Sequence, residues 1–183
     1  MGKAARVPAL SEEELPVAMS EPEFRAAYDS HFDYVWRSLR RLGAPDRDLD
    51  DLAHDTFIAF FRSGYDRARP IKPWLFGIAF RVASDYRRRA QNKYEIAVEH
   101  EATDGAPAAD EQVTANERRR LVLDALATLD LDRRAVFVMH DIDGHSMPEI
   151  ADSLCVPLNT CYSRLRLARA DFQAAVQRRR GEP

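Results

Sequence analysis

The chain carries, at residues 146–172, the sequence SMPEIADSLCVPLNTCYSRLRLARADF, which predicts two helices separated by a tight turn. Ser146 and Glu149 form a capping box, in which each side chain satisfies a backbone N–H group at the start of a helix. Pro157 ends this first helix, and Cys155 stands in the turn where glycine is often favoured. Two helices in this arrangement, the second rich in arginine, are typical of a DNA-binding helix-turn-helix. An ordinary helical hairpin with a solvated arginine face is the alternative.

The second helix of this pair, from residue 158 onward, has one apolar and one polar face. The apolar face comprises Leu158, Cys161, Leu165, Ala168, Phe172 and Val176. At about 100° per residue, the opposite side holds Asn159, Tyr162, Ser163 and Arg166. Because arginine and asparagine pair with guanine and adenine edges, we expect this side to read bases. Arg164 and Arg169 fall on the flanks, where phosphates are expected.

Residues 20–91 predict three further helices, from apolar side chains that recur every three or four positions. A capping box of Ser20 and Glu23 begins the first helix, and Gly43 ends it. The third helix begins near Pro73 and carries Trp74 on its apolar stripe. Core packing is therefore the expected role of this tryptophan, in preference to base stacking.

The helix between them, from Leu49 to Gly64, is amphipathic and has an acidic start. Its inward side chains are Leu49, Leu52, Ala53, Thr56, Phe57, Phe60 and Phe61. Its first turns direct outward Asp50, Asp51, His54 and Asp55. Acidic residues favour the N-terminus of any helix, so this pattern alone is compatible with helix stabilisation or with a docking surface.

The periodicity fades from about Asn92 to Asn116, where Ala, Asp and Glu dominate, and this indicates a flexible linker. Two more helices precede the helix-turn-helix, one marked by Leu121, Val122, Ala125, Leu126 and Leu129 and one from Leu131 to Ile142. No stretch alternates with period two, so we expect an all-α fold of two small helical domains. The expected boundaries are an N-terminal tail at 1–20, a first domain at 21–91, a linker at 92–116, a second domain at 117–178 and a tail at 179–183.

Composition excludes several classes of protein. The chain has 183 residues, of which 45% are hydrophobic, so wholesale disorder is excluded. The net charge of −3 hides acidic runs at 12–14, 46–55 and 95–111 and basic runs at 87–89, 118–120, 164–169 and 178–180. Nucleic-acid binding is therefore compatible with the charge, because local patches set the field that a phosphate meets. With no apolar run of membrane-spanning length and no secretory signal, we expect a cytoplasmic protein without membrane insertion.

The sequence offers no convincing catalytic or metal site. Four possible ligands gather at His140, Asp141, Asp143 and His145. Counted from Asp141, Gly144 falls at the fourth position, whereas a calcium loop needs glycine at the sixth. The two histidines are five residues apart, and not four as on one helix face. No phosphate loop, nucleophile elbow or paired carboxylates are present either. We expect no enzyme, no metal and no cofactor, and no redox switch between Cys155 and buried Cys161.

Several motifs together resemble one protein family. DLAHDTF at 51–57, WLFGIA at 74–79 and DYRRR at 85–89 resemble the promoter-melting domain of extracytoplasmic-function RNA polymerase sigma factors. Residues 146–151 and 156–165 resemble the C-terminal DNA-binding domain of that family. The similarity extends from about Glu23 to Val176, apart from the linker.

This resemblance implies a bacterial transcription initiation factor that binds core RNA polymerase and promoter DNA. The first domain would recognise and open the minus-ten element, and the second would read the minus-thirty-five element. Expected polymerase contacts are Asp51, Leu52, Asp55 and Phe57. Because relatives of this kind are commonly held inactive by anti-sigma factors that cover polymerase-binding surfaces, such a factor is an expected partner.

The resemblance also implies the DNA contacts of each domain. Minus-ten contacts, with the loop at 65–72, are expected from Lys72, Arg81, Asp85, Arg88 and Arg89. Minus-thirty-five contacts are expected from Asn159, Thr160, Tyr162, Ser163, Arg164, Arg166 and Arg169. Arg81 replaces the asparagine of many relatives, and Tyr162 replaces a residue that is often basic.

A stand-alone helix-turn-helix regulator is the alternative function. It explains residues 146–172 but leaves the acidic helix and residues 74–89 without a role. Such a regulator binds duplex DNA tightly by itself, whereas a sigma factor needs core polymerase.

Overall fold

The computed structural model describes residues 19–94 and 110–181, and within them the regular elements are all helices. The acidic run at 12–14, residues 95–109 of the expected linker and residues 182–183 lie outside the described residues. The all-α architecture expected from the sequence is confirmed.

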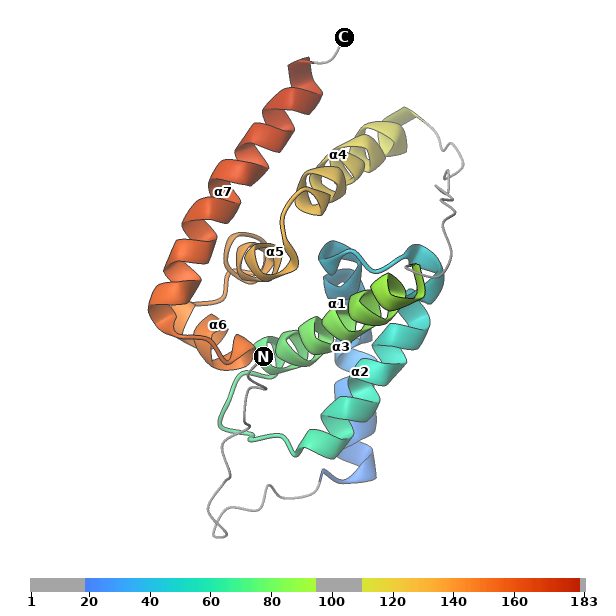
Figure 1. Cartoon of the computed structure of the whole chain (residues 1–183). Coiled ribbons are helices and arrows are strands. Elements are labelled where there is room, and N and C mark those ends of the chain that lie inside the picture. Colours follow the sequence, from blue (N-terminus) through green and yellow to red (C-terminus); the bar gives the residue numbers. More distant parts are fainter. Residues whose placement is uncertain (1–18, 95–109, 182–183) are drawn as a thin grey trace.

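The first half of the chain forms a bundle of three long helices. These are α1 (Glu21–Leu42), α2 (Leu49–Ser63) and α3 (Ile71–Tyr94), with a single 3-10 turn, η1 (Asp46–Asp48), before α2. Figure 1 shows these elements, coloured blue to green, packed together on one side of the molecule.

The second half contains the helix-turn-helix. Its elements are α4 (Asp110–Ala127), α5 (Leu131–Phe137), a single π-helical turn η2 (Val138–Ile142), α6 (Met147–Leu154) and α7 (Leu158–Gly181). The expected helix at 131–142 is therefore α5 continued by η2. Both α3 and α4 extend into residues 92–116, which the sequence predicted as linker.

The two predicted capping boxes are both formed. The backbone N–H of Ser20 donates to Glu23 at 2.9 Å, and that of Ser146 donates to Glu149 at 2.8 Å. These hydrogen bonds satisfy donors that a helix start leaves without an intrahelical partner, so the sequence defines where α1 and α6 begin.

Helices α1 and α6 each end at a residue with a left-handed backbone conformation. Gly43 ends α1 with a φ of 92°, and Cys155 ends α6 with a φ of 54°. Beyond each, the next N–H group donates back into the last turn, from Ala44 to the Leu39 carbonyl at 3.1 Å and from Val156 to the Ala151 carbonyl at 3.0 Å. Cys155 thus adopts a backbone conformation that favours glycine.

The buried side chains form one cluster that runs through both halves. Three side chains expected on inward faces are instead exposed: Phe61 (49%), Val122 (38%) and Leu158 (41%). Phe61 and Leu158 lie at the edges of their apolar stripes, where the neighbouring helices no longer cover them, and Val122 lines a cleft described below.

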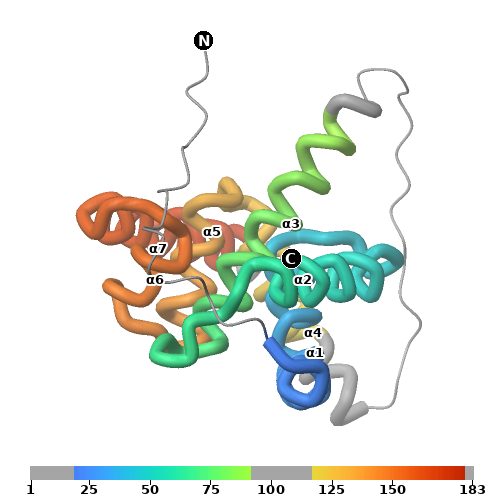
Figure 2. The backbone as a smooth tube through the Cα atoms, turned by 90° about the horizontal axis from the view of Figure 1, so that it is seen from below, coloured from blue at the N-terminus to red at the C-terminus, as the bar shows by residue number. Residues whose placement is uncertain are grey.

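The two halves pack directly against each other. Helix α6 lies on α3, and α1 contacts both α4 and α5 (Figure 2). Gly77 of α3 sits so close to α6 that a Cβ atom there would lie 2.4 Å from the Ser153 carbonyl oxygen. The expected arrangement of two domains is therefore observed here as a closed pair.

Candidate nucleic-acid interface

Helix α7 presents the polar face that the sequence predicted. Its first turn is anchored by Pro157, whose carbonyl accepts from the N–H groups of Thr160 at 2.9 Å and Cys161 at 3.2 Å. Cys161 is completely buried. On the opposite side, the exposed residues are Asn159, Tyr162, Ser163 and Arg166, while Thr160 is half-buried. This surface combines amide, hydroxyl and guanidinium groups, the chemistry that reads base edges.

The two flanking arginines of α7 already have acidic partners. Arg164 is paired with Asp132 of α5. Arg169 binds Asp141 through two hydrogen bonds, of 2.8 Å from Nε and 2.7 Å from Nη2. The hydrogen bonds from Arg169 hold the pKa of Asp141 below its ordinary value. A phosphate at either position therefore has to compete with a carboxylate, which the sequence pattern did not indicate.

The expected minus-ten residues all lie exposed on or near α3. They are Lys72, Arg81, Asp85, Arg88 and Arg89. Asp85 accepts from Arg88 at 3.1 Å, and Lys72 Nζ lies 5.7 Å from the centroid of the Tyr34 ring. Because Arg81, Asp85 and Arg88 are spaced four and three residues apart, they form one stripe along the helix.

The loop before α3 is bound to the helix-turn-helix. Arg69 pairs with Asp152 of α6 at 2.6 Å, and its guanidinium lies 5.5 Å from the centroid of the Trp74 ring. Tyr65 donates a hydrogen bond to the Arg69 carbonyl, which shapes the loop. Trp74 is half-buried and packs against the core, as the sequence predicted. In this closed arrangement the guanidinium group of Arg69 is therefore bound to the protein's own Asp152.

Helix α2 carries an exposed surface of mixed acidic and apolar character. Asp51 and Asp55 are exposed, and Ile58, 47% exposed, continues the same row. Leu52 and Phe57, also expected to contact polymerase, are 4% and 1% exposed. Their side chains hold α2 in the bundle and leave little surface for a partner. Sequence reasoning missed Ile58 as a surface residue, although its spacing from Asp51 and Asp55 was available.

A polar cluster joins α1 to the loop after η2. Asp143 accepts hydrogen bonds from the Tyr34 hydroxyl at 3.1 Å and from Arg41 Nη1 at 2.8 Å. The Tyr34 oxygen also lies 3.3 Å from His145 Nε2. Burial, with the nearby Asp143 charge, raises the pKa of Tyr34 above its usual range, and burial lowers the pKa of His145. These groups belong to the contact between the halves.

Arg134 of α5 is a second link and is 4% exposed. It donates to the carbonyl oxygens of Leu42, at the end of α1, and Leu129, each at 3.0 Å. Burial lowers its pKa to about 10, so it remains protonated at neutral pH. A cation at a helix C-terminus also complements the helix dipole.

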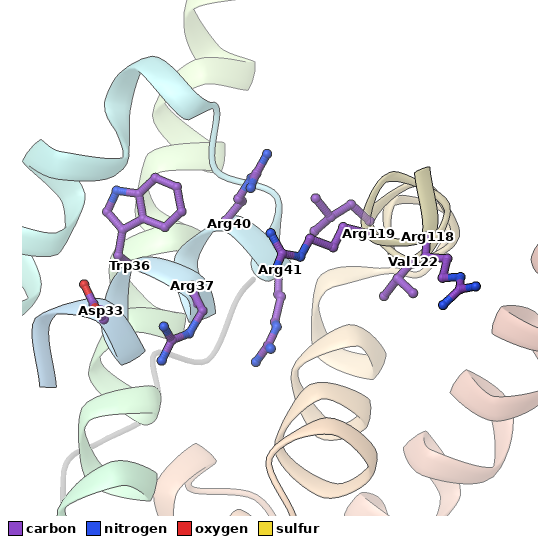
Figure 3. Close-up of a pocket in the computed structure, with 9 residues that line it drawn as sticks. Asp33, Trp36, Arg37, Arg40, Arg41, Arg118, Arg119 and Val122 are labelled. Atoms are coloured by element: carbon purple, nitrogen blue, oxygen red, sulfur yellow. The ribbon is translucent and has the colours of Figure 1, made fainter. Parts of the chain in front are cut away.

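A cleft of about 680 Å³ separates α1 from α4 (Figure 3). Its lining residues are Asp33, Trp36, Arg37, Arg40, Arg41, Arg118, Arg119, Val122 and Leu123. Arg40 pairs with Asp46 at 3.0 Å, and Trp36 Nε1 donates to Asp50 at 3.0 Å. Five arginines and one carboxylate line this cleft beside the apolar side chains of Trp36, Val122 and Leu123. Two of these arginines, Arg40 and Arg41, are already paired with the carboxylates of Asp46 and Asp143.

The described residues contain no group of three or more His, Cys, Asp or Glu side chains that could hold a metal ion. His140 instead contacts Asp141, with Nδ1 2.7 Å from Oδ1. Cys155 is exposed and Cys161 is buried, and burial raises the pKa of the Cys161 thiol. Within the described ranges, no helix is both long and apolar enough to cross a membrane.

Both halves of the chain match known protein-family models. The model of sigma-70 region 2 matches residues 27–93, and the model of sigma-70 region 4 matches residues 119–172. The extracytoplasmic-function RNA polymerase sigma factor SigL of Mycobacterium tuberculosis is 31% identical over 156 residues, which cover 84% of this chain and 88% of SigL. The RNA polymerase sigma factor NccH of Alcaligenes xylosoxydans xylosoxydans is 30% identical, covering 77% of this chain and 80% of NccH.

Two solved structures have the same fold. The structure of CnrH in complex with the cytosolic domain of CnrY superposes with a TM-score of 0.60 at 27% identity, covering 86% of this chain and 90% of CnrH. The sigma factor RpoE of Bartonella quintana, in complex with the anti-sigma factor NepR, superposes with a TM-score of 0.68 at 20% identity, covering 84% and 96%.

Proposed function

The chain belongs to the extracytoplasmic-function RNA polymerase sigma factors, and from this membership we propose how its surfaces divide the work of promoter recognition. Such a factor directs RNA polymerase to promoters and is not an enzyme. The proposed place of action is the cytoplasm, where polymerase and promoter DNA are found.

The polymerase-binding surface is the outward row of α2, formed by Asp51, Asp55 and Ile58. Carboxylates next to an exposed aliphatic side chain suit a basic helical partner, because charge steers docking and apolar burial holds it. Leu52 and Phe57 support this surface from below. Their burial favours a positioning role over direct contact.

The minus-ten element binds along α3 and the loop before it. Lys72, Arg81, Arg88 and Arg89 supply cations for the backbone of an opened strand. The exposed position of all four supports this assignment. Asp85, held by Arg88, lies in the middle of the stripe and accepts hydrogen bonds.

The minus-thirty-five element binds the exposed face of α7. Asn159, Ser163 and Arg166 face the bases, and Arg164 and Arg169 lie near phosphates. Thr160, half-buried in the first turn, borders this face.

Promoter binding requires the two halves to separate. The two elements lie about 25 base pairs apart, roughly 85 Å at about 3.4 Å per base pair. The two helices that carry the reading surfaces, α3 and α7, are 24 residues long each and span only about 36 Å at about 1.5 Å per residue, less than half of that separation. Because α6 packs on α3 in the closed pair, both reading surfaces cannot occupy their elements together in this arrangement.

An anti-sigma factor binds the closed form through the arginine-lined cleft between α1 and α4. The guanidinium groups of Arg37, Arg118 and Arg119, next to the apolar side chains of Trp36, Val122 and Leu123, suit a segment that carries acidic and apolar side chains. Charge reversal at Arg37 and Arg119 is expected to release the sigma factor from its inhibitor and raise transcription from target promoters in the host. Unchanged repression would exclude this cleft as the inhibitor site.

The observation that carries the proposal is the occurrence, in one chain and in family order, of both sigma-70 regions with an exposed recognition face on α7. Run-off transcription tests it, with the chain, core polymerase from the host and a library of randomised promoters. Transcripts are expected downstream of a two-element consensus and only when both proteins are present. Tight binding of the chain alone to duplex DNA, without transcription, would favour a stand-alone regulator.

The docking surface has its own test in the same assay. Asp55→Lys places a cation where a basic partner docks and is expected to weaken polymerase binding about tenfold or more. Glu117→Lys, an exposed charge reversal on α4, is the matched control and is expected to leave polymerase binding unchanged.

A further inference from the structure

Two large apolar side chains are exposed next to each other at the start of α7. Leu158 is 41% exposed and Tyr162 is 54% exposed. They are four residues apart, so they lie on the same side of the helix, one turn from each other. The sequence pattern placed Leu158 on the buried face, whereas the structure leaves it at the exposed edge of that face, next to Tyr162.

The surroundings of this pair are those of a base-reading surface. Asn159 and Ser163 are exposed beside it, and Arg166 continues the row after one more turn. The Ser163 hydroxyl donates to the Thr160 carbonyl at 2.9 Å, which leaves its oxygen free to accept. In a helix-turn-helix, the first residues of the second helix contact the bases. Leu158 is the first residue of that helix.

We propose that Leu158 and Tyr162 read the 5-methyl groups of thymines in the minus-thirty-five element. The floor of the DNA major groove is almost entirely polar, and the thymine methyl is the apolar group that side chains recognise there. This inference rests on the proposed role of α7 and adds a specificity that the hydrogen-bonding residues do not supply.

The spacing of the pair sets the spacing of the thymines. Four residues of helix advance about 6 Å, whereas neighbouring base pairs are about 3.4 Å apart. The two methyl groups therefore belong to base pairs one or two steps apart, on either strand.

Deoxyuridine, which is thymine without its methyl group, tests this directly. The complete holoenzyme is bound to a promoter selected from the randomised library, and each thymine of the minus-thirty-five element is replaced singly by deoxyuridine. At two positions the replacement is expected to weaken promoter binding about fourfold, the effect of losing one methyl-sized apolar contact. The other thymines are expected to tolerate the change.

Side-chain variants then show which side chain contacts which thymine methyl group. Leu158→Ala and Tyr162→Ala are each expected to abolish the deoxyuridine effect at one position, so that thymine and uracil bind equally. Tyr162→Phe keeps the ring and is expected to retain the effect. Gln173→Ala, at an exposed position further along α7, is the control. It is expected to leave the ratio of affinities for the thymine and deoxyuridine promoters unchanged at every position. Because both target side chains are exposed, the helix content of the variants is expected to match that of the wild type.

Several outcomes would overturn the proposal while leaving the sigma-factor assignment intact. One is transcription from the selected promoter with no thymine whose methyl group matters, and another is a consensus in which no two thymines, on either strand, lie one or two base pairs apart. A loss of inhibitor binding in the variants, with silent deoxyuridine substitutions, would assign the pair to a protein partner instead. Absence of transcription from every promoter would contradict the proposed function itself.

Discussion

A Cβ atom on Gly77 would lie 2.4 Å from the carbonyl oxygen of Ser153. Real Cβ atoms do not approach a backbone oxygen so closely, so α3 and α6 can pack in this way only with glycine at position 77. The contact joins α3 of the first half to α6, the first helix of the helix-turn-helix, and a single methyl group there is a sensitive probe of the closed pair.

Gly77→Ala is expected to separate the two halves. Alanine favours an isolated helix over glycine by about 1 kcal/mol, so α3 itself gains stability while its contact with α6 is lost. Small-angle X-ray scattering should show a larger radius of gyration than for the wild type, with unchanged helix content. Ser84→Ala, elsewhere on α3, is the control. An unchanged radius with a higher melting temperature would show that α6 accommodates the methyl group.

Arg134→Leu is expected to lower the free energy of unfolding by about 2–3 kcal/mol. The variant leaves the buried carbonyl oxygens of Leu42 and Leu129 without their donor, and each lost partner costs about 1–3 kcal/mol, partly offset by removing a buried charge. Urea denaturation measures the change. Equal or greater stability would mean that water replaces the guanidinium at both carbonyls.

Cys155→Gly is expected to raise the free energy of unfolding by about 1 kcal/mol. Cys155 has a φ of 54°, where a side chain is strained and glycine is not. Calorimetry should show a higher melting temperature for this variant. Cys161→Gly, by contrast, removes a fully buried side chain and should lower the melting temperature.

Acid is expected to lower the free energy of unfolding through His145, which lies at the contact between the two halves. Burial keeps its pKa below the ordinary 6.5, against the opposing charges of Asp143 and Glu149 and with a contribution from Lys72. The unfolded chain therefore binds the proton more readily. The His145 contribution to stability is complete above about pH 6.5 and is lost as pH falls toward the lowered pKa. His145→Gln should reduce the slope of unfolding free energy against pH in this range, and an identical slope would contradict the assignment.

Arg166 and Arg169 are expected to differ in what their loss does to promoter binding. Arg166→Ala should cost about 1–3 kcal/mol at the preferred promoter and relax the preference at one base pair. Arg169→Ala should weaken binding to every promoter variant equally and flatten its salt dependence, because one phosphate contact fewer releases fewer counter-ions from the DNA. Holoenzyme binding across single-base promoter variants, at two salt concentrations, separates the two patterns. An equal loss on all variants for Arg166→Ala would refute base reading there.

The helices could be predicted because their signals are local. The Ser20 and Ser146 capping boxes define where helices begin, and apolar periodicity defines their inner faces. The exposed face of α7 followed from the same periodicity, since burial of Cys161 turns Asn159 and Ser163 outward. The edges of the apolar stripes were not predictable, because the width of a buried face depends on how neighbouring helices cover it.

Contacts between helices could not be predicted from the pattern. Arg164 and Asp132 are 32 residues apart, and Arg169 and Asp141 are 28 apart, so their pairing depends on how α7 crosses α5 and η2. The burial of Arg134 has the same origin, because the carbonyl group of Leu42 that it binds comes from the other half of the chain. A basic run in a sequence reports charge, whereas only the fold reports which of those charges already have a partner.

The ion pair between Arg69 and Asp152 occupies a guanidinium of the loop at 65–72, for which minus-ten contacts are proposed. If the loop holding Arg69 binds the phosphates of an opened strand, one guanidinium cannot serve both anions at full strength. Promoter capture and release of the helix-turn-helix then form a reciprocal equilibrium, in which each event lowers the free energy of the other by the same amount.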